Sequence, residues 1–293
     1  MTKKVYDLSK WNIITSYDAI AKEVDGVIIR CGYRGNATGK LTMDPTYIEK
    51  ITELYKRGVP VGIYFFTTAI TEFEAREEAV FAIKLAENLN IDLSFPIMVD
   101  SEYAKSDHNG RSDKLSNANR TNILLAFINQ CHESGYEAAI YSSDAWFVQK
   151  LDYNKLKGIK KWVARYGNKP SRATDTMIGW QKTNESSSAG IRGNVDENEW
   201  YADINKAAAK YTAPIVEDVK EVVVELKEGK EIVLKDCPLY SSSASNKVVR
   251  KISGKYYIWS AKKILGRVRI TNDPKNIGVA SKVTGWIKVE DIK

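Results

Sequence analysis

The sequence predicts an α/β protein in which an irregular (β/α)8 barrel is followed by a second, small all-β barrel domain. Two observations predict the first barrel: short apolar runs recur along the chain, and amphipathic segments fill the first gaps between them. Continuously apolar runs are typical of strands buried on both faces, and strand-helix alternation favours a barrel. The eight predicted strands are Lys4–Asp7, Gly26–Arg30, Val59–Phe66, Pro96–Asp100, Ala138–Tyr141, Lys161–Tyr166, Met177–Gln181 and Gly193–Asp196.

Helices are predicted only in the first half of this barrel. The later gaps, after Tyr166 and after Gln181, span roughly ten residues each and barely meet the minimum for a helical crossover. Pro170 and Gly190 in these gaps also discourage a helix, so we expect an irregular barrel on that side. The predicted helices, two of which are followed by a glycine that favours a helix end, are Tyr17–Lys22, Pro45–Arg57, Glu72–Leu89 and Asn117–Ser134.

A second domain is predicted where the composition changes, around residues 207–214. We expect the first domain to cover residues 1–209, a linker 210–220, and the second domain 221–293. Short apolar runs in this last part are separated by Lys-Glu-Gly, Ser-Ser-Ser and Ser-Gly-Lys turns, which is the rhythm of a small β-barrel. Its predicted strands are Val222–Leu226, Glu231–Leu234, Val248–Ile252, Tyr256–Trp259, Arg267–Thr271 and Gly285–Val289.

Positive charge is concentrated in the second domain. Of the 44 Lys and Arg and 37 Asp and Glu in the chain, residues 217–293 hold 16 and 10, which leaves 28 and 27 for the remainder. A basic surface favours an anionic polymer as partner. Nucleic acid is the competing partner, because 255–259 and 267–269 mix aromatic and basic residues. Such mixing also arises on the solvent face of ordinary strands, and we predict no nucleic-acid binding.

The sequence gives no sign of a cofactor, a metal site or a membrane span. Its histidines are His108 and His132, and it lacks the Cys-x-x-Cys and His-Glu-x-x-His patterns of zinc sites. Three scattered cysteines form no disulfide framework, as expected in a reducing cytosol. No apolar run approaches transmembrane length, and the N-terminus does not read as a secretion signal.

Carboxylates follow several of the predicted strands. Asp100 and Glu102 stand two residues apart after an apolar run, and residues two apart on a strand point the same way. Asp7 and Asp196 end two further strands, and barrel chemistry gathers at the C-terminal ends of strands. Such carboxylates suit glycoside hydrolysis, in which one acid protonates the leaving oxygen. The alternatives are a solvated turn for the Asp-Ser-Glu triplet and a turn or helix cap for Asp196.

Several of these runs together resemble the ordered motifs of the family 25 glycoside hydrolases, which are lysozyme-type muramidases and often phage endolysins. The resemblance covers roughly residues 3–205. Residues 283–292 resemble the end of bacterial SH3-like domains, which anchor wall hydrolases. The motifs that carry the first resemblance are Val5–Trp11, Gly62–Phe66, Pro96–Glu102, Trp162–Tyr166, Trp180–Gln181 and Val195–Asp196.

The resemblance implies a peptidoglycan hydrolase, an N-acetylmuramidase that cleaves the β-1,4 bond between N-acetylmuramic acid and N-acetylglucosamine and causes bacterial lysis. Glu102 then matches the general acid, Asp100 its partner that orients the substrate N-acetyl group, and Asp7 and Asp196 two further acids of the pocket. A cytoplasmic enzyme released to the wall by a holin is implied, with anionic wall polymers as partners of the small domain. The alternatives are a non-catalytic glycan-binding barrel and a chitinase- or glucosaminidase-type hydrolase.

Further candidates for substrate contacts are aromatic or polar residues near the predicted strand ends. Aromatic rings stack on sugars and donate hydrogen bonds, although core packing is an open alternative for each ring. Arg30 stands where one branch of the family has lysine, and the loop that follows it departs from that branch's pattern. The candidates are Tyr64, Tyr141, Tyr166, Trp180, Gln181, Trp11 and Arg30.

Overall fold

The computed structural model describes residues 2–204, 226–243, 248–264 and 266–292. The chain divides into two compact units, residues 1–215 and 216–293, and each is described by itself. The predicted linker, residues 210–220, and the predicted strand Val222–Leu226 fall outside the described residues except for Leu226. In the described part of the chain, no helix is both long and apolar enough to cross a membrane.

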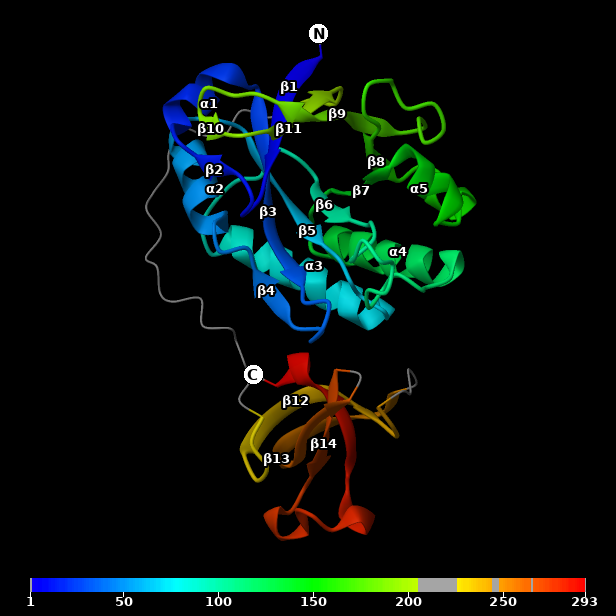
Figure 1. The fold of residues 1–293 in the computed structure, drawn as a ribbon. Helices are drawn as coiled ribbons and strands as arrows, with labels where there is room; N and C mark the ends of the chain where they lie inside the picture. The colour runs from blue at the N-terminus through cyan, green and yellow to red at the C-terminus, as the bar shows by residue number, and fades with distance from the viewer. Residues whose placement is uncertain (1, 205–225, 244–247, 265, 293) are drawn as a thin grey trace. The chain divides into compact units, whose positions relative to one another are not determined.

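The first unit is built around a closed barrel of eight strands, which confirms the predicted α/β barrel (Figure 1). β1 closes it by pairing in parallel with β3 on one side and antiparallel with β11 on the other. Going round from β1, the strands are β1 (Lys3–Leu8), β3 (Gly26–Arg34), β5 (Val61–Phe66), β6 (Ile97–Asp100), β7 (Ala138–Ser143), β8 (Lys160–Ala164), β9 (Met177–Ser186) and β11 (Val195–Trp200).

The last strand corrects the prediction in extent and in direction. Instead of ending at Asp196, β11 runs from Val195 to Trp200, and it pairs antiparallel with both β9 and β1. The connection from Ser186 is too short for the helical crossover that a parallel strand requires, so the chain folds back as a hairpin. Asp196 therefore lies at the start of its strand, and the helix-cap alternative for it is wrong.

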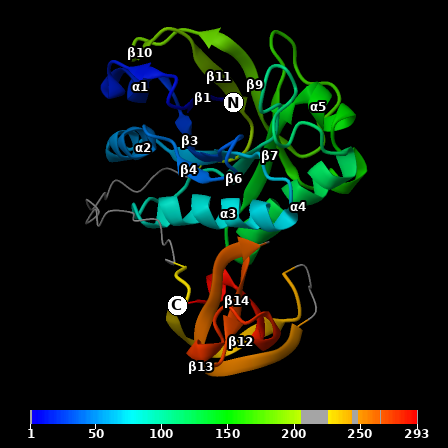
Figure 2. The ribbon, with the colours of Figure 1, turned by 60° about the horizontal axis from the view of Figure 1, so that its bottom comes forward.

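The helices lie outside the strands, and α2, α3 and α4 can be followed in Figures 1 and 2. Ser16, Thr71 and Ser116 begin α1, α3 and α4, and each side chain accepts a hydrogen bond from a backbone N–H of the first turn. The prediction missed α5 (Asp144–Gln149) and the short strands β2 (Ile13–Ile14), β4 (Leu41–Met43) and β10 (Ile191–Arg192). The confirmed helices are α1 (Tyr17–Glu23), α2 (Tyr47–Lys56), α3 (Glu72–Glu87) and α4 (Asn117–Glu133).

Two apolar cores hold this unit together. The larger one fills the space between strands and helices, and the smaller one fills the inside of the barrel around Met98, Trp162 and Trp200. Two glycines make room for the inner rings, because a Cβ on Gly62 would meet Phe95 and a Cβ on Gly179 would meet Trp200. These rings close the end of the barrel where the parallel strands begin, which leaves the opposite end for polar side chains.

The second unit contains a closed barrel of four strands: β12 (Glu231–Tyr240), β13 (Val248–Ile264), β14 (Arg267–Thr271) and β15 (Gly285–Lys288). The predicted strands Val248–Ile252 and Tyr256–Trp259 are one continuous strand, so the predicted Ser-Gly-Lys turn is wrong. Both halves of β13 pair with β12, and the irregularity between them is an extra residue on β12, where Asp236 has a φ of +50°, so β13 does not reverse there. The resemblance of this barrel to SH3-like domains stays a prediction.

Candidate active site

Four carboxyl groups from three strands meet in one cavity of about 260 Å³ in the first unit. Asp7 comes from β1 and Asp196 from the start of β11, and the two are direct partners across these antiparallel strands. Asp100 ends β6, and Glu102 follows two residues later. The antiparallel direction of β11 brings Asp196 to the rim where the parallel strands end. The other lining residues are Tyr64, Tyr141, Trp162, Tyr166, Gln181 and Asn184.

Asp7 is held by two amide donors. Gln181 Nε2 donates to its Oδ2 at 3.0 Å, and Asn198 Nδ2 donates to the same oxygen at 2.9 Å. Burial raises the pKa of Asp7, and the charge of Asp196 raises it further, although both amides oppose the rise. The pKa of Asp196 is also raised by burial. Two adjacent acids with raised pKa values retain a proton more readily than separate ones.

The amide of Gln181 is itself fixed by two phenols. Its Oε1 accepts hydrogen bonds from Tyr141 at 2.8 Å and from Tyr166 at 3.2 Å. Trp162 acts similarly on the other side, where its Nε1 donates to Asn198 Oδ1 at 2.7 Å. Because both amide oxygens accept, both amide nitrogens must face Asp7. The aromatic side chains that line the cavity thus orient the Asp7 carboxyl through these two amides.

Asp100 lacks this support. Its side chain is buried, and among the described residues its Oδ1 has no hydrogen-bond partner. Burial is the main reason that the pKa of Asp100 is well above its ordinary value, and the Glu102 carboxyl adds to the rise. A buried acceptor without a donor is costly, so this oxygen is available to a donor on a bound molecule.

Glu102 stands just beyond β6 and is exposed to solvent at the mouth of the cavity. Its pKa is raised by partial burial and by the charge of Asp196, whereas Arg30 opposes the rise. A carboxyl with a raised pKa keeps its proton closer to neutral pH, which is what a general acid requires.

Ser101, between the two acids, fixes the turn from which Glu102 projects. Its N–H donates to the Tyr141 carbonyl at 3.1 Å, and its own carbonyl accepts from Ser142 Oγ at 2.6 Å. Its hydroxyl accepts from Trp146 Nε1, on α5, at 3.2 Å. Every polar group of this buried serine is therefore bonded to β7 or α5. No sequence pattern had indicated a role for Ser101 or Trp146.

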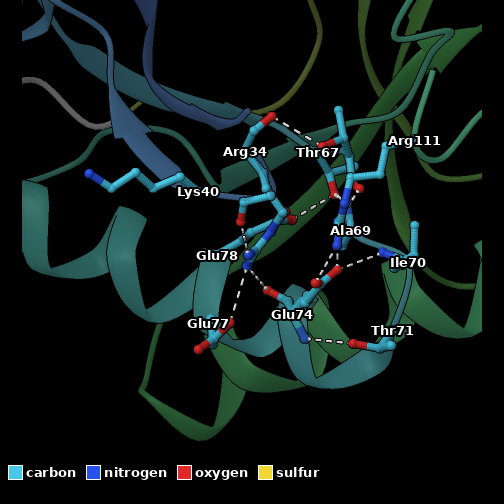
Figure 3. Close-up of polar contacts among 12 residues, drawn as sticks. Arg34, Lys40, Thr67, Ala69, Ile70, Thr71, Glu74, Glu77, Glu78 and Arg111 are labelled. Atoms are coloured by element: carbon cyan, nitrogen blue, oxygen red, sulfur yellow. Dashed lines mark hydrogen bonds and ion pairs between the residues drawn. The ribbon is translucent and has the colours of Figure 1, made fainter. Parts of the chain in front are cut away.

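The loop that follows Glu102 is tied to two neighbouring loops by the polar network drawn in Figure 3. Arg111, in this loop, donates to both carboxylate oxygens of Glu74 on α3, at 2.7 and 2.5 Å, and to the Thr68 carbonyl at 2.9 Å. Next to it, Arg34 of β3 donates to the buried Glu78 at 2.7 Å. Burial raises the pKa of Glu78 to about 7 despite this arginine. The network thus joins the loops after β3, β5 and β6 on one side of the cavity.

Three of the predicted substrate-contact residues do not line the cavity. Trp180 donates its Nε1 to the Arg165 carbonyl at 2.8 Å, because it is adjacent to Gln181 on β9 and adjacent strand residues point to opposite faces. Arg30 pairs with Asp44 at 2.7 Å, and it acts on Asp100 and Glu102 only through its charge. Trp11 is 75% exposed, in the loop after β1.

Sequence reasoning also missed Asn198 and Asn184, and it treated Trp162 mainly as a strand residue. The inward alternation of Asp196, Asn198 and Trp200 was the available signal, since residues two apart share a face. Within the described residues, no group of three or more His, Cys, Asp or Glu side chains could hold a metal ion. All three cysteines are buried and free.

A barrel whose rim gathers carboxyl groups beside aromatic rings is the arrangement expected of a sugar-cleaving enzyme. A family model described as "Glycosyl hydrolases family 25" matches residues 6–191, more than half of the chain. The chain therefore belongs to glycoside hydrolase family 25. Among curated proteins, none matches the sequence.

Solved structures of known proteins share the fold. The modular autolysin LytC from Streptococcus pneumoniae, also solved with a synthetic peptidoglycan ligand, is 30% identical with a TM-score of 0.60, over 68% of this chain and 47% of that one. This chain thus spans about half the length of LytC. The catalytic domain of the endolysin ply40, from bacteriophage P40 of Listeria monocytogenes, is 24% identical (TM-score 0.55; 68% and 93% covered). SleM, a spore cortex lytic enzyme of Clostridium perfringens, is 18% identical (TM-score 0.57; 98% and 84% covered).

Proposed function

We propose that this protein is an N-acetylmuramidase, which hydrolyses the β-1,4 bond between N-acetylmuramic acid and N-acetylglucosamine in peptidoglycan. The observation that carries the proposal is the meeting of Asp7, Asp100, Glu102 and Asp196 in one cavity with aromatic walls. Membership of family 25 and the likeness to LytC, which was solved with a peptidoglycan ligand, support the choice of substrate.

In the proposed reaction, Glu102 gives its proton to the glycosidic oxygen as the bond from that oxygen to the sugar carbon breaks. The acetamido oxygen of the substrate bonds to this carbon, and the free Oδ1 of Asp100 accepts the acetamido N–H and orients the group. Water then attacks the same carbon, the bond from this carbon to the acetamido oxygen breaks, and the water gives a proton to Glu102. The charges of Asp7 and Asp196 offset positive charge that develops on the sugar.

The proposal is tested by Glu102→Gln, which keeps the shape of the side chain but cannot donate the proton. Hydrolysis of purified walls should fall by about a hundredfold to ten-thousandfold, while the circular dichroism spectrum stays unchanged. Glu185→Gln, at an exposed position of β9 outside the cavity lining, is the matched control and should retain activity. Near-normal turnover by Glu102→Gln would show that Glu102 is not the general acid.

The bond itself is identified by reducing the digestion products with borohydride and analysing them by mass spectrometry. New reducing ends on N-acetylmuramic acid are expected. Reducing ends on N-acetylglucosamine indicate a glucosaminidase instead, and cleavage of chitin oligosaccharides at a comparable rate indicates a chitinase-type enzyme. The lysis of a host cell and the release of the enzyme by a holin remain proposals that depend on this result.

A further inference from the structure

One side of the small barrel, directed away from its apolar core, carries arginine and aromatic side chains in alternation: Arg269 and Trp286 are half-buried, whereas Tyr240, Trp259 and Arg267 are buried. The apolar core contains Val268 and Ile270 of β14 and Ile287 of β15, so their strand neighbours point away from it. These outward residues meet across neighbouring strands, since Trp286 pairs with Arg269 on one side and with Tyr240 on the other. We call the following set the arginine face: Tyr240, Trp259, Arg267, Arg269 and Trp286.

Each guanidinium on the arginine face lies against aromatic rings. The Cζ atom of Arg269 is 4.2 Å from the ring centre of Trp259 and 5.4 Å from that of Trp286. The Cζ atom of Arg267 is 4.1 Å from the ring centre of Tyr240. Trp259 is anchored in turn, because its Nε1 donates to the Asn276 carbonyl at 2.8 Å. Stacking of this kind holds the planar guanidinium groups in fixed orientations.

Neither arginine has a carboxylate partner among the described residues. The buried Nε atoms of Arg267 and Arg269 lack hydrogen-bond partners there, and Arg267 is only 7% exposed. Its Nη1 does donate to the carbonyl of Ser243. By contrast, Lys255 on the same barrel is exposed and pairs with Glu231 at 2.9 Å. Burying a cation without a counter-charge is unfavourable, so an anion from outside the chain would relieve the cost.

We propose that the arginine face binds the phosphodiester groups of an anionic polymer of the bacterial wall. Guanidinium groups fixed on rings present paired N–H donors that match phosphate oxygens. Arg267 and Arg269 are two residues apart on one strand, roughly 6.6 Å, and successive phosphates of a chain with three-carbon units repeat on this scale. The excess of 16 basic over 10 acidic residues in 217–293 favours a polyanion. The choice of the wall rests on the proposed function.

The test uses the full chain carrying Glu102→Gln, so that walls are bound but not digested. Co-sedimentation is measured with walls that retain their phosphate polymers and with the same walls after these polymers have been removed. In this background, Arg269→Gln should weaken binding to the untreated walls by about ten- to a hundredfold. Arg269→Lys, which keeps the charge but loses the planar fork, should lose part of the binding. Removal of the phosphate polymers should abolish the difference between the variants.

The matched control is Lys255→Gln, which removes the same unit of charge from the small barrel at a lysine that already has a partner. Equal loss of binding with Lys255→Gln and with Arg269→Gln would overturn the arginine face in favour of general charge attraction. Soluble poly(glycerol phosphate) should displace the protein from walls at low concentration. Displacement by polyglutamate but not by poly(glycerol phosphate) would overturn the phosphodiester assignment. Sedimentation needs no bond cleavage, so its outcome is separate from the test of the muramidase.

Discussion

The two barrels differ in the ionisable groups that lack a partner of opposite charge. These groups are carboxyl groups in the large barrel and arginines in the small barrel. In the large barrel, four carboxyl groups line an internal cavity, and no Lys or Arg is among its lining residues. In the small barrel, Arg267 and Arg269 lie on the side of β14 that faces away from the apolar core, and no described carboxylate pairs with them. The large barrel raises the pKa of its acids by burial, whereas the small barrel stabilises its cations with aromatic rings.

This difference between the two barrels indicates what each site can do. A carboxyl whose pKa is raised by burial keeps its proton to higher pH and can give it to a leaving oxygen, so a cavity that gathers several carboxyl groups suits acid catalysis on a sugar. A guanidinium cannot lose its proton at any ordinary pH, so a face of arginines suits binding without chemistry. Elsewhere in the large barrel, the buried Arg34 has an acid partner, Glu78, whereas the buried Arg120 donates to backbone carbonyls. What marks both of the proposed sites is a group of like charges without partners of opposite charge.

Of the further variants that test this comparison, Asp100→Asn, which removes one of the unpaired acids, is expected to have the largest effect. Hydrolysis should fall by roughly a hundred- to a thousandfold, because the amide oxygen can accept the acetamido N–H but carries no charge to stabilise the positive charge that develops on this group. The variant should also be more stable than the wild type at neutral pH, because ionised Asp100 is costly when buried. Kinetics on soluble glycan chains and thermal unfolding over a pH series measure both.

The pH dependence of this stability difference has a definite sign. The pKa of Asp100 is raised in the folded protein above its ordinary value of 3.8. The free energy of unfolding of the wild type therefore falls, relative to that of Asp100→Asn, as the pH rises from 3.8 through the pKa of the folded protein. Below pH 3.8 residue 100 is neutral in both proteins, so this difference is absent. Asp92→Asn, at an exposed acid, is the control. A pH-independent difference between Asp100→Asn and the wild type would contradict the assignment.

A smaller effect is expected from Arg111→Met, which tests whether paired arginines of the large barrel position the acid. Loss of the two bonds to Glu74 should loosen the loop after Glu102 and lower kcat, by up to about a hundredfold for a displacement near 1 Å. KM should change little, since Arg111 does not line the cavity. Kinetics of Arg111→Met, Glu74→Gln and the double variant measure the coupling.

The double variant should be no worse than the more damaging single variant, because both remove the same ion pair. Arg57→Met is the matched control: Arg57 is also paired with acids, Asp18 and Glu53, but at the end of α2. If Arg57→Met lowers kcat as much as Arg111→Met does, the effect is one of general stability. A rise in KM alone would also argue against a positioning role.

Most strands and helices could be predicted from the sequence, because apolar runs and the glycines that end helices are local signals. The acids Asp7 and Asp100 could be placed at one rim because each ends such a run. Asn198 was missed because the polar residues of β11 do not form an apolar run, and only its alternation with Asp196 and Trp200 indicated the direction of its side chain. The pairing of Arg30 with Asp44 depends on β4 and α2, so no local pattern indicated it. Trp180 and Gln181 were both proposed for the pocket, although strand alternation allows only one of them to face it.

The smallest effect is expected at Trp11, where the large barrel has its own cation-aromatic pair. Lys10 Nζ lies 4.7 Å from the Trp11 ring centre, and the loop is held by hydrogen bonds from Lys50 Nζ to the carbonyls of Ser9 and Asn12. A fixed and exposed ring can stack on a sugar beyond the cavity, so Trp11→Ala should raise KM on long glycan chains roughly two- to tenfold. Ile13→Ala, at a position that is 53% exposed, is the control and should leave KM unchanged. If Trp11→Ala raises KM equally on the shortest cleavable fragment, the ring acts inside the cavity region rather than beyond it.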